Sequence, residues 1–165
     1  MREEAGKDLT SCLSQAERNS APGSGEKPQG GFNPLVPELD VSDLGASLEF
    51  WCNLLGFRVV YDRPAAGFAF CERGGAQVML CQINGEWRTG PLERPFGRGI
   101  NFQIAVEDVD TLLGKLENAE WPLFRDVKEA WYRVGEEERG SREFLVLDPD
   151  GYLVRLSQSL GSRAS

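Results

Sequence analysis

The 165-residue chain contains no histidine. Imidazole is the commonest protein ligand for zinc, nickel and iron, and the side chain best suited to act as a general base near neutral pH. Its absence excludes Ser–His and Cys–His catalytic pairs and leaves any metal centre to carboxylates, amides and thiols. We therefore expect a binding protein without metal or other cofactor in preference to an enzyme.

Long apolar segments are absent as well. No run approaches 18 apolar residues, and the N-terminus lacks the apolar core of a signal peptide. The four cysteines, Cys12, Cys52, Cys71 and Cys81, form no C-x-x-C pair and no metal-site spacing. They predict free thiols in a reducing cytoplasm, so we expect a soluble cytoplasmic protein.

The chain has fewer basic than acidic residues. Lys and Arg number 18 against 26 Asp and Glu, and residues 1–33 hold only four of the basic and five of the acidic groups. A folded part this acidic repels phosphate backbones, which argues against nucleic acid as a partner and favours cationic small molecules. The alternative is an acidic surface that serves solubility alone.

The first 33 residues differ in composition from the rest. Residues 19–33 are rich in turn formers and nearly devoid of core residues. They predict a disordered or loosely held N-terminal arm over residues 1–33. Within this arm, the residues near Leu9–Ala16 could form a short helix; the alternative is a disordered extension without a role. Residues 34–160 then form one domain, large enough to bury a core.

A strand–helix pattern occurs twice in that domain. The strand candidates 35–41 and 100–106 each lead to a capping aspartate, Asp43 and Asp108, and then to leucines at helical spacing. The aspartates lie 65 residues apart, so the repeat is a whole supersecondary unit. The first copy continues through a helix that ends at Gly56 and strands 57–63, 67–72 and 76–83. The second continues through a helix 108–119 and strands near 122–127, 130–134, 142–147 and 152–157. These are two tandem βαβββ modules, about 35–83 and 100–158, joined by a polar loop.

This layout and two segments resemble the vicinal oxygen chelate (glyoxalase) superfamily, and within it the bleomycin resistance proteins. One segment runs from Val36-Pro37 through Val41-Ser42-Asp43-Leu44 and Phe50-Trp51 to Gly56-Phe57; the other is Arg142-Glu143-Phe144 followed by Asp148-Pro149-Asp150-Gly151. The resemblance covers residues 35–160. It implies an α+β fold with curved mixed β-sheets, a homodimer, and clefts at the dimer interface that sequester bleomycin-like cationic drugs.

The resemblance also gives the places where enzymes of the superfamily hold a metal, about Val36, Met79, Asn101 and Arg155. Valine and methionine are poor ligands for a hard divalent ion, and a single asparagine is weak. The fixed charge of an arginine repels a cation. We therefore expect no metal, and interpret nearby Glu38 as a partner of Arg155 across the cavity, with two unrelated surface charges as the alternative.

Strand parity predicts the floor of the cavity. If Phe102, Ile104 and Val106 pack beneath the helix, Asn101, Gln103 and Ala105 face the other way. The same alternation turns Arg155 in the last strand and Glu38 in the first toward the cavity. Polar groups like these need partners or water, so a wet binding cleft is favoured over a structural core.

Aromatic residues gather near the expected rim: Phe68, Trp87, Phe96, Trp131 and Tyr132. Flat rings beside the acidic run 136–138 suit a large planar cation. Prototype resistance proteins carry a tryptophan shortly before the Arg-Glu-Phe triplet, where this chain has Arg139-Gly140-Ser141. Either Trp131 replaces that platform or the ligand differs.

Two rival functions stay open at this point. One is a metal-independent enzyme with Glu38 as general base, although a carboxylate that faces an arginine makes a weak base. The other is a vestigial cleft in a protein that serves as a scaffold or sensor.

Overall fold

The computed structural model describes residues 25–86 and 88–164. The chain divides into two compact units between Ile83 and Asn84, and each unit is described by itself. Within the described residues, no helix has the length and apolar character needed to cross a membrane.

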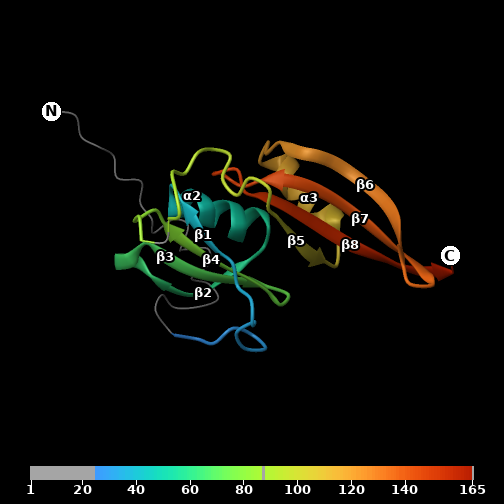
Figure 1. Ribbon diagram of the computed structural model, residues 1–165, viewed down its shortest axis with the longest axis horizontal. Helices are drawn as coiled ribbons and strands as arrows, with labels where there is room; N and C mark the ends of the chain where they lie inside the picture. The colour runs from blue at the N-terminus through green and yellow to red at the C-terminus, as the bar shows by residue number, and fades with distance from the viewer. Residues whose placement is uncertain (1–24, 87, 165) are drawn as a thin grey trace. The chain divides into compact units, whose positions relative to one another are not determined.

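Unit 1 is a four-stranded mixed sheet with a helix on one face (Figure 1). Its elements are β1 (Glu38–Val41), α2 (Leu44–Leu48), the π-helical segment η1 (Glu49–Leu54), β2 (Arg58–Arg63), the short 3-10 turn η2 (Pro64–Ala66), β3 (Phe68–Arg73) and β4 (Ala76–Gln82). The strand order is β1-β4-β3-β2. β1 runs parallel to β4, and the other pairs are antiparallel.

Local sequence signals set the limits of the first helix. The Asp43 carboxylate accepts the backbone N–H of Ala46 at 3.0 Å, which satisfies one of the free donors at the helix start. The chain leaves the helix at Gly56, whose φ of 75° is left-handed and favours glycine. Between them Phe50, Trp51 and Leu55 are buried against the sheet side of the helix.

Unit 2 repeats the layout with β5 (Asn101–Val106), α3 (Val109–Asn118), β6 (Leu123–Val134), β7 (Glu137–Leu147) and β8 (Leu153–Ala164), in the order β5-β8-β7-β6. Val109, Leu112 and Leu116 are buried where α3 packs against β7 and β8. Asp108 caps α3 and accepts from the Thr111 hydroxyl at 2.6 Å. That hydrogen bond, with the Asp110 N–H, holds the pKa of Asp108 below its ordinary value. The predicted α+β fold of two tandem modules is confirmed.

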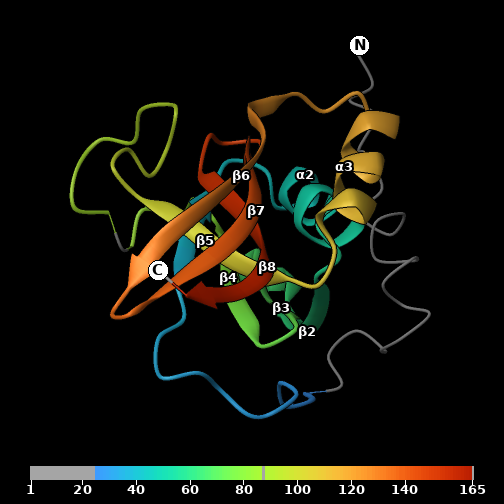
Figure 2. The same ribbon diagram turned by 90° about the vertical axis from the view of Figure 1, so that its right-hand side faces the viewer.

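Two parts of the strand prediction are wrong. The strands predicted at 142–147 and 152–157 are longer, since β7 begins at Glu137 and β8 continues to Ala164. The predicted strands 122–127 and 130–134 are a single strand, β6, which pairs with β7 over its whole length. The polar stretch Arg125–Glu129 has the composition of a turn, but two register shifts, around Arg125, absorb the irregularity without ending the strand. The result is a long β6–β7 hairpin with the end of β8 beside it (Figure 2).

Candidate functional site

The face of the unit 2 sheet opposite α3 carries three of the four residues predicted for the polar floor: Asn101, Gln103 and Arg155. Asn101 and Gln103 on β5 lie in register with Leu153 and Arg155 on β8, and Arg155 lies in register with Leu145 on β7. The buried residues Val154 and Leu156 alternate with them and point toward α3. We call this surface the amide face and define it by Asn101, Gln103, Glu143, Arg155 and Tyr132.

Arg155 has two partners on the amide face. Its guanidinium donates to the Gln103 side-chain oxygen and lies 3.7 Å from a Glu143 carboxylate oxygen. The Glu143 side chain is 13% exposed, so most of this ion pair is shielded from water. The Arg155 Nε is buried and has no hydrogen-bond acceptor among the described residues. The arginine is therefore held in place with its charge balanced by a neighbour.

The two aromatic residues of the hairpin lie on opposite faces of the sheet. Arg142 points to α3, where it pairs with Asp110 at 2.7 and 2.8 Å, while its neighbour Glu143 pairs with Arg155. Trp131 is in register with Gly140 and so shares the α3 side, and Tyr132 shares the amide face. Tyr132 is 53% exposed. Strand parity places Tyr132, and not Trp131, on the same face as Gln103 and Arg155, opposite Arg139 and six positions along β7 from the Leu145 that pairs with Arg155.

Trp131 packs against its own sheet. A side chain at Gly140 would meet the indole ring at 2.8 Å, so the ring lies directly over that glycine. The Arg163 guanidinium stands 4.1 Å from the ring centroid and also binds Glu138 at 2.7 Å. The Trp131 indole thus fills the space above Gly140, in the segment Arg139-Gly140-Ser141 where prototype resistance proteins have a tryptophan. The Arg163 guanidinium already stacks on this indole.

Phe96 is also engaged within its unit. The ring is buried and meets Tyr152 edge-on at 5.9 Å, and the Phe96 N–H donates to the Asp150 carbonyl at 2.9 Å. These contacts fix the loop before β5 to the turn between β7 and β8. Trp87, the other aromatic residue predicted in this loop, lies outside the described residues.

Unit 1 presents a different surface on the side of its sheet away from α2. There Tyr61 stacks on Phe70 with centroids 5.1 Å apart, and Phe68 packs beside them with Met79 and Cys81. Phe68 is only 6% exposed. Next to this cluster the buried polar residues Glu72 and Gln77 pair across β3 and β4. We call this surface the arm face and define it by Tyr61, Phe68, Phe70, Glu72, Gln77 and Met79.

Residues 26–33 run along the arm face, and they are the blue segment of Figure 1. The Gln29 N–H donates to both carboxylate oxygens of Glu72, at 3.1 and 3.0 Å. The Gln77 side chain accepts the Asn33 N–H at 2.8 Å and donates to the Gly31 carbonyl at 2.7 Å. Sequence reasoning missed these contacts because they engage the arm's main chain, which leaves no side-chain pattern.

Glu38 lies on β1 in register with Met79 and is exposed. It belongs to unit 1 and Arg155 to unit 2, so their pairing stays a prediction. The predicted division of the chain at residue 33 also stays a prediction.

The residues at the superfamily's metal places do not fit a divalent ion. Met79 packs with the aromatic cluster of the arm face, and Arg155 brings a positive charge that Glu143 balances. Within residues 25–86 and 88–164, no three Cys, Asp or Glu side chains come together in a cluster that could hold a metal. No step of a metal-assisted reaction can be assigned to these positions.

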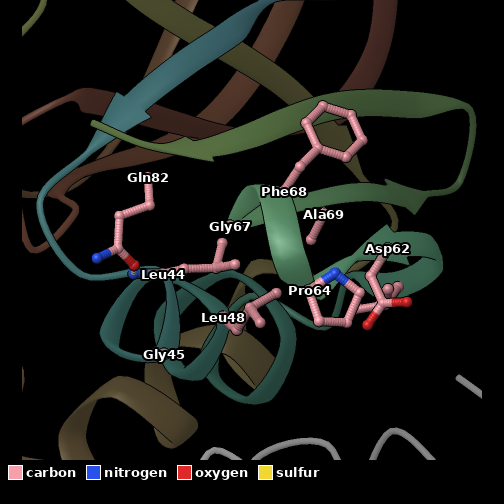
Figure 3. Close-up of a pocket in the computed structure, with 10 residues that line it drawn as sticks. Leu44, Gly45, Leu48, Asp62, Pro64, Gly67, Phe68, Ala69 and Gln82 are labelled. Carbon is pink, nitrogen blue, oxygen red and sulfur yellow. Dashed lines mark hydrogen bonds between the residues drawn. The ribbon is translucent and has the colours of Figure 1, made fainter. Parts of the chain in front are cut away.

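A small apolar cavity lies in unit 1 between α2 and the edge of the sheet (Figure 3). Its volume is about 140 Å³, and Leu44, Leu48, Val59 and Ala69 line it. Asp62 stands at its wall, and one of its carboxylate oxygens is buried without a hydrogen-bond partner among the described residues. A space of this size accepts a single small ring at most. It is too small for a drug of bleomycin's size.

Sequence comparison adds to this geometry. The profile of the Glyoxalase/Bleomycin resistance protein/Dioxygenase superfamily matches residues 32–156. The chain belongs to this superfamily. A bleomycin resistance protein of Geobacillus stearothermophilus is 28% identical over 141 residues, which cover 77% of this chain and 97% of the relative. A probable lactoylglutathione lyase of Synechocystis is 27% identical over 125 residues, covering 72% and 89%.

Solved structures agree with the superfamily fold. TioX from Micromonospora sp. ML1 aligns with a TM-score of 0.61 and 21% identity, over 78% of this chain and all of that one. At this identity the likeness shows the fold alone. The relatives include a bleomycin resistance protein and a probable lactoylglutathione lyase, so membership of the superfamily does not by itself decide between these two roles.

Proposed function

We propose that this protein binds a bleomycin-like molecule, cationic and partly flat, without a metal and without changing it chemically. The observation that carries the proposal is the amide face. It offers exposed amide side chains, Asn101 and Gln103, beside an arginine whose charge is already balanced. Amides on a rigid sheet recognise a peptide-like ligand by hydrogen bonds. The exposed ring of Tyr132 on the same face supplies a surface for stacking.

The amide face has little that could catalyse a reaction. Glu143 is its carboxylate, and it is already engaged by the Arg155 guanidinium, 3.7 Å away. The chain has no histidine to act instead. The relationship to a probable lactoylglutathione lyase keeps an enzyme as the second candidate. Mass spectrometry of the ligand after incubation separates the two, because an enzyme returns it changed.

We also propose that the protein acts as a homodimer, with the ligand at the boundary between subunits. Unit 2 exposes several large apolar side chains: Ile100, Phe124, Val127, Tyr132 and Val134. Four of them lie on β6, the edge strand of the sheet, and an exposed apolar edge strand is a ready surface for pairing with a second copy, usually in a twofold dimer. Sedimentation at micromolar concentration should give twice the chain mass of 18.3 kDa. A monomer under those conditions would contradict the dimer.

Bleomycin titration followed by intrinsic fluorescence tests the amide face. Gln103→Ala should weaken binding by about tenfold, since a contact at the centre of the face is lost. Asn118→Ala is the matched control, because Asn118 is an exposed amide at the end of α3 and should leave the affinity unchanged. Equal affinities for both variants would remove the amide face from the proposal.

A further inference from the structure

We propose that residues 26–33 are a tethered, displaceable ligand of the arm face, and that this face is a second binding site for molecules in which an aromatic ring is joined to consecutive amides. The proposal concerns unit 1 and does not depend on ligand binding by the amide face of unit 2. It rests on two observations. The arm face contacts main-chain groups of the arm, and the ring of Phe32 in the arm is more than half exposed.

The arm face recognises backbone groups. Glu72 and Gln77 are 5% and 6% exposed, and their side chains turn to the N–H groups of Gln29 and Asn33 and the carbonyl of Gly31. Buried polar side chains that contact main-chain groups accept any segment with the same spacing of amides. The contacts therefore describe a peptide-reading surface that the chain's own arm occupies.

The ring of Phe32 supplies the second element of recognition. It meets Phe70 edge-on at 5.5 Å and Tyr61 at 6.4 Å, above the stacked pair that these two residues form. Yet 58% of Phe32 is exposed. A ring that buries less than half of its surface is weakly held by the hydrophobic effect. Another aromatic ring can therefore take its place.

The charge balance of the arm face does not depend on the arm, so the arm can be replaced by another molecule. Arg58 pairs with Glu72 and also lies 3.7 Å from Glu26 of the arm. When the arm leaves, Glu72 keeps Arg58 as its partner, so the buried carboxylate stays neutralised. The incoming molecule has to supply an N–H for Glu72, an N–H and a carbonyl for Gln77, and the ring. It also has to supply a donor for the Gly75 carbonyl, which the Asn33 side-chain amide contacts at 2.6 Å in the arm.

The turn in the arm allows a substitution that removes one contact without changing the backbone conformation. Gly31 N–H donates to the Pro28 carbonyl at 2.9 Å, which closes a turn with Gln29 and Gly30 at its centre. Gly30 has a φ of 84°, as the third position of a type II turn requires, and proline is favoured at the second. Gln29→Pro thus keeps the turn and removes the arm N–H that donates to Glu72, while Arg58 still donates to it. Phe32→Ala removes the ring.

The probe is a fluorescent peptide with the sequence of residues 26–34, titrated into the full chain and followed by anisotropy. The variant with Gln29→Pro and Phe32→Ala should bind it at least about tenfold more tightly than the unaltered chain, because the tethered arm no longer competes. Leu35→Ala is the control, since Leu35 is 84% exposed and lies just beyond the arm. It should bind the peptide as weakly as the unaltered chain, and a peptide with alanine for phenylalanine should bind neither protein.

Hydrogen exchange on the unaltered chain tests the same proposal without any substitution. The amides of Gln29 and Asn33 should be protected, but should open far more often than those of β3 and β4. Exchange as slow as in those strands would make the arm a permanent part of the fold and overturn the proposal. So would a peptide that binds neither protein, or binds both equally well.

Discussion

The arm face and the amide face occupy corresponding sheets of a repeated fold, yet they are built for different tasks. The arm face is an aromatic surface with two buried polar residues, and the chain's own segment lies on it. The amide face is polar and exposed along β5, with its arginine balanced within the sheet. Duplication of a module thus preserves the backbone layout while the outward-facing side chains diverge. Changes at the buried residues of the arm face should mainly affect stability, and changes on the amide face should mainly affect bleomycin binding.

The largest effect should come from the centre of the arm face. Phe70 is 2% exposed and contacts both Tyr61 and Phe32. Phe70→Ala should lower the free energy of unfolding by about 3–5 kcal/mol, because the lost ring leaves a cavity. Tyr132→Ala, on the amide face, should change it by less than about 0.5 kcal/mol. Urea denaturation of both variants checks the contrast, which would break down if the two losses were similar.

A smaller effect is expected from the buried acid of the arm face. Glu72→Ala removes the acceptor of Arg58 and of the Gln29 N–H, and should lower the free energy of unfolding by about 1–3 kcal/mol. Glu138→Ala is the control, because its ion pair with Arg163 lies at the surface and should contribute no more than about 1 kcal/mol. Thermal or urea unfolding distinguishes the two variants. Equal losses of unfolding free energy would show that Glu72 contributes no more than a surface ion pair.

On the amide face the expected change is in affinity. Tyr132→Ala should weaken bleomycin binding by about tenfold, or about 1.4 kcal/mol, with no loss of stability. Leu92→Ala is the control, since Leu92 is an exposed apolar residue of unit 2 outside the set proposed for the dimer interface. A calorimetric titration in which Leu92→Ala matters more than Tyr132→Ala would show that the ligand lies elsewhere on unit 2.

The smallest effect concerns the helix start in unit 2. The pKa of Asp108 is held below its ordinary value of 3.8 by the Thr111 hydroxyl and the Asp110 N–H. A carboxyl with a lowered folded-state pKa contributes stability above its unfolded pKa, and this contribution is lost as the pH falls through the folded value. Asp108→Asn should therefore flatten the fall in stability between pH 6 and about pH 3. An unchanged pH profile, measured by urea unfolding, would contradict this.

Much of the fold could be predicted from local signals. Asp43 and Asp108 cap their helices as the repeat predicts, and the alternation of polar and apolar residues correctly turns Gln103 and Arg155 away from α3. Counted along the predicted strand 130–134, the same alternation would have separated Trp131 from Tyr132. The irregular pairing around Arg125 hid only the continuity of β6, because bulges break the period on which such counting depends.

The arm contacts were beyond prediction for a different reason. Residues 29–31 read as a linker because Gln-Gly-Gly carries no apolar pattern, while Glu72 and Gln77 read as ordinary strand residues. Their hydrogen bonds join a side chain to a main chain more than 40 positions away. Only the tertiary fold brings such groups together, so no local rule reveals them.

The most direct test of the central claim is a calorimetric titration of bleomycin into the full-length chain after treatment with a metal chelator, followed by mass spectrometry of the recovered ligand. We predict micromolar affinity or better, about 8 kcal/mol of binding free energy, and a ligand of unchanged mass. The account is contradicted if no heat of binding appears at millimolar ligand, if affinity returns only with added metal, or if the ligand is recovered chemically modified.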